Sequence, residues 1–312
     1  MGPNVRRLVG LDDDQYRGMT AGKPTDALLA QFADFLVPVI ENVTIESKES
    51  LLDLIEELVA MDFPSQAIRL ADLNPTLAPT EQPDGLKAIG TACLLTGEFG
   101  RAEICFRDAQ ALDSSDPAPY VNMTQLLYAD HRMDEALEWC SSGLDVEPNH
   151  RKLWEYLAAI LTKIDEVSAP DKVRERATSL NSWAGLSLGC DMQMPGDSAL
   201  QAEILSRLYD EGERDGEFLT EYTAALGGAG SYDRIALVVL QAERFATAGL
   251  PWQLYAHSLQ ANLARGLRDH AEADLKKLAS LNTVPKNVMD SLAQVVQESD
   301  QHEHHDHHEP LH

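Results

Sequence analysis

The positions of apolar residues repeat along the chain at a step of 34 residues. In each copy a large apolar residue is followed by apolar residues three and seven positions further on, which places all three on one face of a helix. The equivalent positions hold Leu86, Tyr120 and Trp154, then Ile89, Met123 and Leu157, then Cys93, Leu127 and Leu161. A small residue, Ala102 or Ala136, follows where a second helix would cross the first closely. The pattern therefore predicts a series of helical hairpins.

Turn residues separate the predicted helices. Gly97 allows the chain to reverse after the first helix, and Pro148 stands where the second hairpin must end. Together with these, the pattern resembles the tetratricopeptide repeat, a family of helix-turn-helix repeats. The matching residues are Leu86, Ile89, Gly90, Cys93, Ala102, Phe106 and Ala109 in the first copy, and Tyr120, Met123, Leu127, Ala136, Cys140 and Pro148 in the second. A third copy opens with LWEYLAAIL, but the position of its second-helix alanine holds Pro170.

The remaining segments also have helical spacing, without the signature residues. Helical patterns ending at glycine or starting after Asp, Ser or Pro fill residues 26–82 and 170–292, and no alternating strand pattern competes with them. The resemblance implies an all-α, right-handed solenoid of helical hairpins with disordered termini. The expected organisation is a flexible segment at 1–25, degenerate helix pairs at 26–82, tetratricopeptide repeats at 83–169, degenerate hairpins at 170–292 and a disordered acidic, histidine-rich tail at 293–312.

Charge and composition exclude some classes of partner and a membrane span. The chain carries 51 acidic and 25 basic side chains, a formal net charge of −26, which disfavours nucleic acid and anionic membranes as partners. No stretch of about 18 apolar residues occurs, so no membrane span is expected. The four cysteines lack CxxC spacing and are expected to be reduced core thiols. A cytoplasmic location is the expectation.

The concave groove of a repeat array is where a partner peptide is expected to bind. Some tetratricopeptide domains hold the terminal carboxylates of partner peptides with Lys and Asn side chains of successive repeats. The corresponding positions here are Lys87, Thr91, Asn122, Lys152 and Tyr156, of which Lys87, Asn122 and Lys152 match. The resemblance implies Lys87, Asn122, Lys152 and Tyr156 as partner-binding residues. The alternative is that they are ordinary solvated residues of the groove.

Catalytic signatures are missing from the sequence. No Ser-His-Asp order, kinase set or cofactor fingerprint is found, and the glycines of LGGAGSYDR do not match a phosphate-binding loop. We therefore expect a protein that is not an enzyme and requires no cofactor. An active site among residues 170–292 remains the alternative.

The end of the chain carries the clearest metal chemistry. Six of the ten histidines lie between residues 302 and 312, interleaved with carboxylates. They are His302, His304, His305, His307, His308 and His312. Imidazole nitrogens suit Ni(II) and Zn(II), and carboxylates favour the bound cation. Such tracts resemble those of nickel-handling accessory proteins of hydrogenases and ureases. The alternative is a solvated polar end with adventitious metal affinity.

These features predict a non-catalytic adaptor that binds a protein partner and assists assembly of, or metal delivery to, a metalloenzyme. The alternative is a general interaction scaffold or chaperone whose histidine-rich tail has no physiological metal role.

Overall fold

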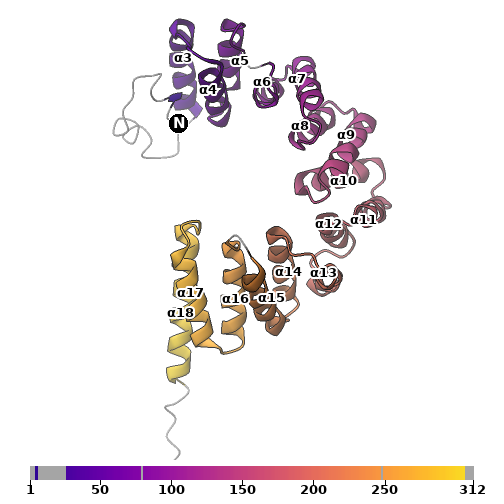
Figure 1. Cartoon of the computed structure of the whole chain (residues 1–312), viewed down its shortest axis with the longest axis vertical. Helices are drawn as coiled ribbons and strands as arrows, with labels where there is room; N and C mark the ends of the chain where they lie inside the picture. The colour runs from indigo at the N-terminus through magenta and orange to yellow at the C-terminus, as the bar shows by residue number, and fades with distance from the viewer. Residues whose placement is uncertain (1–3, 6–25, 79, 247–248, 306–312) are drawn as a thin grey trace, which may run out of the picture. The chain divides into compact units, whose positions relative to one another are not determined.

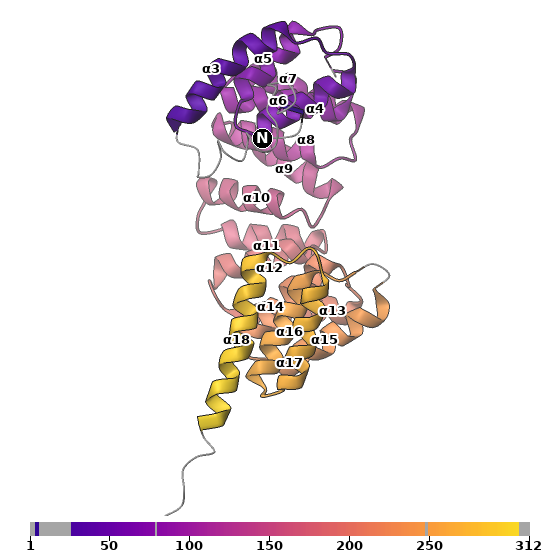
Figure 2. The same cartoon turned by 90° about the vertical axis from the view of Figure 1, so that its left-hand side faces the viewer.

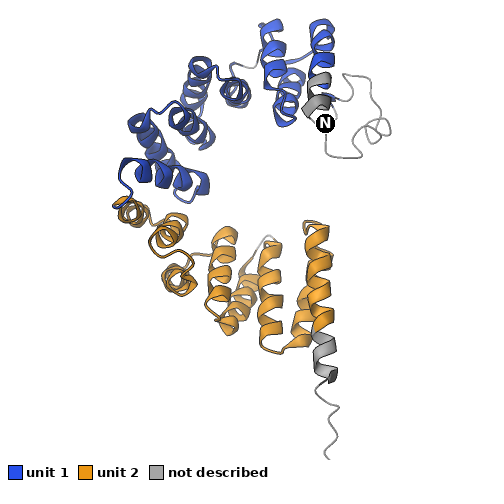
Figure 3. Ribbon diagram, turned by 180° about the vertical axis from the view of Figure 1, so that it is seen from behind, with its two compact units in different colours: residues 1–167 blue, residues 168–312 orange. Residues whose placement is uncertain are grey.

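The computed structural model describes residues 4–5, 26–78, 80–246 and 249–305, excepting the side chains of residues 26–31 and 299–305. Helices and the turns between them make up these ranges, and no strand occurs in them, which confirms the predicted all-α array of helical hairpins (Figure 1). Contacts between Cα atoms divide the chain into two compact units, residues 1–167 and residues 168–312 (Figure 3). We refer to them as unit 1 and unit 2.

Unit 1 is a succession of antiparallel helices. Its helices are α3 (Asp26–Asn42), α4 (Lys48–Ala60), α5 (Pro64–Leu73), α6 (Pro83–Thr96), α7 (Phe99–Leu112), α8 (Ala118–Ala129), α9 (Met133–Val146) and α10 (Arg151–Ile164). The two signature repeats are the hairpins α6–α7 and α8–α9, and each packs most closely within itself. Gly97 ends α6 with a φ of 81°, a left-handed conformation that glycine adopts without a steric penalty. The turn predicted from Gly97 is therefore observed.

Small residues set how closely the helices of unit 1 approach. A Cβ atom on Gly90 would lie 2.6 Å from Cε1 of the buried Phe106 ring, so glycine is needed where α7 crosses α6. Gly143 has the same role on α9, because a Cβ atom there would lie 2.8 Å from Cβ of Tyr120. Ala102 and Ala136 are fully buried, as expected for close-crossing positions.

The start of unit 1 departs from the expected flexible segment at 1–25 in one respect. Of these residues the structure describes only two, and the backbone N–H groups of Asn4 and Val5 donate to the carboxylate of Glu57, with N···O distances of 3.1 and 2.7 Å. Val5 is fully buried. These two residues are thus held against α4.

The stretch LWEYLAAIL lies in α10, the last helix of unit 1. Helix α10 packs back on α8 and α9, and unit 1 ends at Val167. Pro170 lies in the first turn of the next helix, where its missing N–H costs nothing, and that helix pairs with its own successor. Pro170 therefore starts a new unit and does not occupy a close-crossing position.

Unit 2 has the same hairpin construction. Its helices are α11 (Ala169–Ser179), α12 (Trp183–Gln193), α13 (Ser198–Glu211), α14 (Gly216–Gly228), α15 (Tyr232–Phe245), α16 (Trp252–Ala264), α17 (Arg268–Ser280) and α18 (Lys286–His305). Although the signature residues are absent, the step of 34 residues persists in its contacts. Three side-chain pairs are each separated by 34 residues: Ser187 with Glu221, Thr223 with His257, and Glu243 with Lys277.

The last helix extends beyond the position where the sequence places the start of a tail. Helix α18 continues to His305, past residue 292, and runs alongside α16 and α17 (Figure 2). Leu292 and Val296, one turn apart, are buried against Leu259, Ala271 and Leu278. This apolar contact keeps residues 293–298 part of unit 2. The structure does not describe residues 306–312.

Candidate functional site

The residues predicted to bind a partner lie on one series of helices in unit 1. Helices α4, α6, α8 and α10 contact one another in order, and we call them the inner helices. In Figure 1, α6 and α8 lie on one side of unit 1, and their hairpin partners α7 and α9 lie on the other. Lys87 is on α6, Asn122 on α8, and Lys152 and Tyr156 on α10. The sequence frame thus places all four on the same helix series.

Lys87 is already engaged by carboxylates of its own chain. Its Nζ lies 2.5 Å from Oδ2 of Asp116 and 2.8 Å from Oδ1 of Asp84, and 21% of its side chain is exposed. Burial acts to lower the pKa of Lys87, but the two carboxylates outweigh it and the pKa is raised. The neighbouring Thr91 donates its hydroxyl proton to the carbonyl of Lys87. Lys87 therefore braces α6 against the loop before α8.

Asn122 lies on α8 one helical turn before Gln125. Its side chain is partly exposed, and no hydrogen bond to it is found in the described part of the chain. Its amide group is therefore available to a partner, in contrast to the ammonium group of Lys87.

An aromatic pair flanked by lysines lies where α8 meets α10. The rings of Tyr128 and Tyr156 are 6.1 Å apart between centroids and tilted by 55°. Nζ of Lys163 lies 4.2 Å from the centroid of the Tyr128 ring, and Nζ of Lys152 lies 5.3 Å from that of Tyr156. We call these four residues the α8–α10 cluster.

Each lysine of the cluster is attracted to the electron-rich face of a ring. Lys152 also pairs with Glu155 at 3.1 Å, and that hydrogen bond raises the pKa of Lys152. Burial raises the pKa of Tyr156, so its hydroxyl stays protonated at neutral pH. Among the described residues, no carboxylate lies within ion-pair distance of Lys163, which is exposed. Lys163 thus presents a cation without a carboxylate partner beside the Tyr128 ring.

Tyr128 and Lys163 were missed by the sequence analysis, which considered only positions of the carboxylate-binding pattern. A signal was present for Tyr128. Tyr120, Met123 and Leu127 are the repeat positions of α8 that pack into the core. Tyr128 follows directly after Leu127 and is not needed for that packing. Lys163 could be found only from its distance to Tyr128.

The opposite side of unit 1 is braced by arginines at nearly regular spacing. Each arginine reaches back to a carboxylate 28 or 29 residues earlier, on the preceding hairpin: Arg69 to Glu41, Arg101 to Asp72, and Arg132 to Glu103. These pairs join α3 to α5, α5 to α7, and α7 to the residue that precedes α9. This side is therefore occupied by structural ion pairs.

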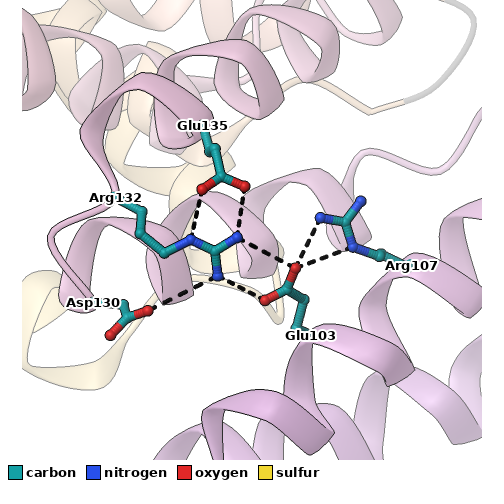
Figure 4. Close-up of polar contacts among 5 residues, drawn as sticks. All are labelled: Glu103, Arg107, Asp130, Arg132 and Glu135. Atoms are coloured by element: carbon teal, nitrogen blue, oxygen red, sulfur yellow. Dashed lines mark hydrogen bonds and ion pairs between the residues drawn. The ribbon is translucent and has the colours of Figure 1, made fainter.

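The Arg132 pair is part of a larger network (Figure 4). The guanidinium of Arg132 donates to Glu103 at 2.7 Å and to both carboxylate oxygens of Glu135, at 2.5 and 2.7 Å. Arg107 donates to the same Glu103 at 2.8 Å. Hydrogen bonds from Arg132 hold the pKa of Glu103 and of Glu135 below their usual values. Every charge drawn in the network has an internal partner, so we assign it to structure.

The predicted metal ligands fall outside what the structure describes. This holds for the side chains of His302, His304 and His305 and for the whole of His307, His308 and His312. Within the described ranges, no three His, Cys, Asp or Glu side chains gather as metal ligands. The four cysteines are buried and form no disulfide with one another, and burial raises the pKa of Cys93 to about 12. Its thiol is therefore unreactive at neutral pH.

None of the helices, over the residues described, combines the length and apolar character needed to cross a membrane.

Comparisons with known proteins show a likeness of fold only. No protein-family model matches the chain, and no curated protein matches its sequence. Among solved structures, the chain resembles a tetratricopeptide repeat protein from Parabacteroides merdae, with 18% identity, a TM-score of 0.39, and coverage of 80% of this chain and 98% of that one. It also resembles pilF of Pseudomonas aeruginosa, with 14% identity, a TM-score of 0.36, and coverage of 79% and 97%. A third similar structure is YrrB, described as a TPR protein with an unusual peptide-binding site, with 16% identity, a TM-score of 0.37, and coverage of 61% and 97%. At these values the similarities carry no argument about partners.

Proposed function

We propose that the chain is a non-catalytic adaptor that binds a peptide segment of a partner protein on the inner helices of unit 1. The α8–α10 cluster is the observation that carries this proposal. Two partly exposed rings offer apolar surface, and Lys163 offers a cation that no carboxylate of the described chain neutralises. Aromatic anchors beside a free cation are a common way to bind a peptide.

The partner segment has an acidic group next to an apolar side chain. The carboxylate pairs with Lys163, and the apolar side chain packs against Tyr156. Asn122 adds a hydrogen bond from α8. Lys152 contributes its contact with the Tyr156 ring, while Lys87 is occupied by Asp84 and Asp116 and only shapes the surface.

A display library of random twelve-residue peptides tests this function on the full chain. We expect selected peptides to be enriched in Asp or Glu beside an aliphatic or aromatic residue. Tyr156→Ala and Lys163→Met should each weaken a selected peptide about tenfold, the effect of losing one charge-assisted or aromatic contact.

Lys172→Met is the matched control, because Lys172 is exposed on α11 and lies outside the cluster. It should leave the affinity unchanged, and circular dichroism should show the same helix content for all variants. Equal affinities of the Lys163→Met and Lys172→Met proteins would contradict the proposal.

A second candidate function is metal handling by the end of the chain, in a cytoplasmic adaptor that assists assembly of a metalloenzyme such as a hydrogenase, with nickel as the leading metal. The supporting observation is the density of imidazole and carboxylate groups between residues 302 and 312. Four buried cysteines that form no disulfide with one another are in keeping with a reducing compartment.

Calorimetric titration with Ni(II) or Zn(II) tests the metal role. Helix α18 reaches His305, so replacing all six histidines with Gln is a cleaner test than deleting residues 301–312. We expect the variant to lose binding, and the natural chain to lose affinity below about pH 6.5 as imidazoles protonate. Undiminished metal binding by the variant would exclude the tail as the metal-binding site. A peptide affinity that is the same with and without a chelator would favour a general interaction scaffold.

A further inference from the structure

A hollow of about 330 Å³ lies among helices α14, α15 and α16 of unit 2. Its space exists because small residues stand where longer side chains would fill it, among them Ala224, Gly227 and Ala261. The volume is at the lower end of the range of about 300–1,000 Å³ for ligand pockets. It therefore suits one large side chain better than a whole cofactor.

His257 supplies the main polar group of the hollow. Its Nδ1 lies 2.8 Å from Oγ1 of Thr223. The Thr223 hydroxyl is also 2.9 and 3.1 Å from the carbonyl oxygens of Leu219 and Thr220, so it donates its single proton to these helix carbonyls. Nδ1 of His257 must then donate to Oγ1, which leaves Nε2 as a hydrogen-bond acceptor. Burial lowers the pKa of His257, so this neutral form prevails at pH 7.

The lining favours an uncharged occupant. Among the described residues, none of the side chains that line the hollow is an acid, a lysine or an arginine, in a chain whose formal net charge is −26. Tyr232 and Gln260 add neutral polar groups at its edge. A charged group placed here would lose hydration without gaining a counter-charge. The matching ligand is an aromatic ring that carries a hydrogen-bond donor.

We propose that the hollow is a second recognition pocket, which takes a tyrosine side chain of the partner protein with its ring against Ala224, Gly227 and Ala264 and its hydroxyl donating to Nε2 of His257. The pocket rests on the proposed adaptor function, but it belongs to a different unit from the α8–α10 cluster. Tyrosine fits better than phenylalanine because its hydroxyl satisfies the acceptor that a plain ring would leave unpaired.

Side-chain analogues probe the pocket directly in the full chain. We would titrate p-cresol, the analogue of tyrosine, and toluene, the analogue of phenylalanine, and follow the His257 ring signals by NMR. The His257→Gln variant identifies these signals. We expect p-cresol to bind with a dissociation constant on the order of 1 mM and toluene about tenfold more weakly.

Two alanine variants separate the pocket from non-specific binding. Ala224 is exposed and lines the hollow, so Ala224→Leu should fill it and weaken p-cresol at least tenfold without disturbing the core. Ala273 is exposed on α17 away from the hollow, and Ala273→Leu should bind p-cresol normally. Equal binding by these two variants, equal binding of toluene and p-cresol, or no binding of p-cresol would overturn the proposal.

Two capped peptides test whether the bound phenol group belongs to a protein or to a free small molecule. One is acetyl-GSGSYGSGS-amide, and its twin has phenylalanine in place of tyrosine. The tyrosine peptide should compete with p-cresol, and the twin should not. Competition by neither peptide would overturn the assignment to a protein partner, in favour of a free phenol. Tyr156→Ala should leave p-cresol binding unchanged, so the pocket and the α8–α10 cluster can fail independently.

Discussion

Glycine positions show how single residues determine the packing of unit 1. Gly90 and Gly100 are both helical, but they face different surroundings. A Cβ atom on Gly90 would collide with the Phe106 ring, whereas nothing lies within 4 Å of a Cβ atom built on Gly100. The same substitution should therefore have opposite effects at the two positions.

Gly90→Ala is expected to destabilise the protein by about 1–3 kcal/mol, because α6 and α7 must move apart to admit the methyl group. Gly100→Ala is expected to stabilise it by about 0.5 kcal/mol, since it reduces the freedom of the unfolded chain. Chemical denaturation of both variants measures the difference. A loss of stability at both positions would show that the close approach at Phe106 is not the cause.

Individual residues of the candidate site were only partly predictable. The 34-residue frame places Lys87, Asn122, Lys152 and Tyr156 on the inner helices, but it does not reveal that Asp84 and Asp116 occupy Lys87. That pairing depends on where the loop before α8 passes, and no periodic pattern encodes loop paths. The functional use of these residues stays a prediction.

Among the elements, α18 extends past residue 292, after which the sequence analysis placed the start of the tail. Charged and histidine residues dominate its last turns, and they obscure the apolar pair Leu292 and Val296 that packs on α16 and α17. Val288, Met289, Leu292 and Val296 do recur at helical spacing, but the charged and histidine-rich composition that follows them outweighed this signal. The contact becomes evident only in three dimensions.

Leu292→Ala tests whether α18 is part of unit 2. The substitution removes a side chain that is 6% exposed, and a cost of about 2–5 kcal/mol is expected. Val295→Ala is the control on the same helix, because Val295 is 44% exposed and its truncation should cost less than about 0.5 kcal/mol. Hydrogen exchange of residues 286–298 should accelerate in the first variant only. Unchanged exchange in the Leu292→Ala protein would mean that the helix is not anchored there.

At the scale of the whole molecule, the hairpin architecture could be predicted because a 34-residue period in the sequence specifies it. Its division into two units could not. The boundary at Val167 falls between α10 and α11, whereas the stretch LWEYLAAIL in α10 has the pattern that starts another repeat. In unit 2 the signature residues are gone, but pairs such as Thr223 with His257 keep the repeat length. Polar contacts between equivalent turns can thus maintain a period after its apolar markers have diverged.

The arginine pairs of unit 1 also have a mechanical meaning. The three ion pairs, made by Arg69, Arg101 and Arg132, each connect one pair of neighbouring repeats. Each pair can therefore break without breaking the others. Added salt screens exposed charges and should weaken all three ion pairs together, whereas substitution of one arginine should weaken a single contact between neighbouring repeats. A force applied to the ends of unit 1 should then separate its hairpins one at a time, beginning at the weakest contact between neighbours.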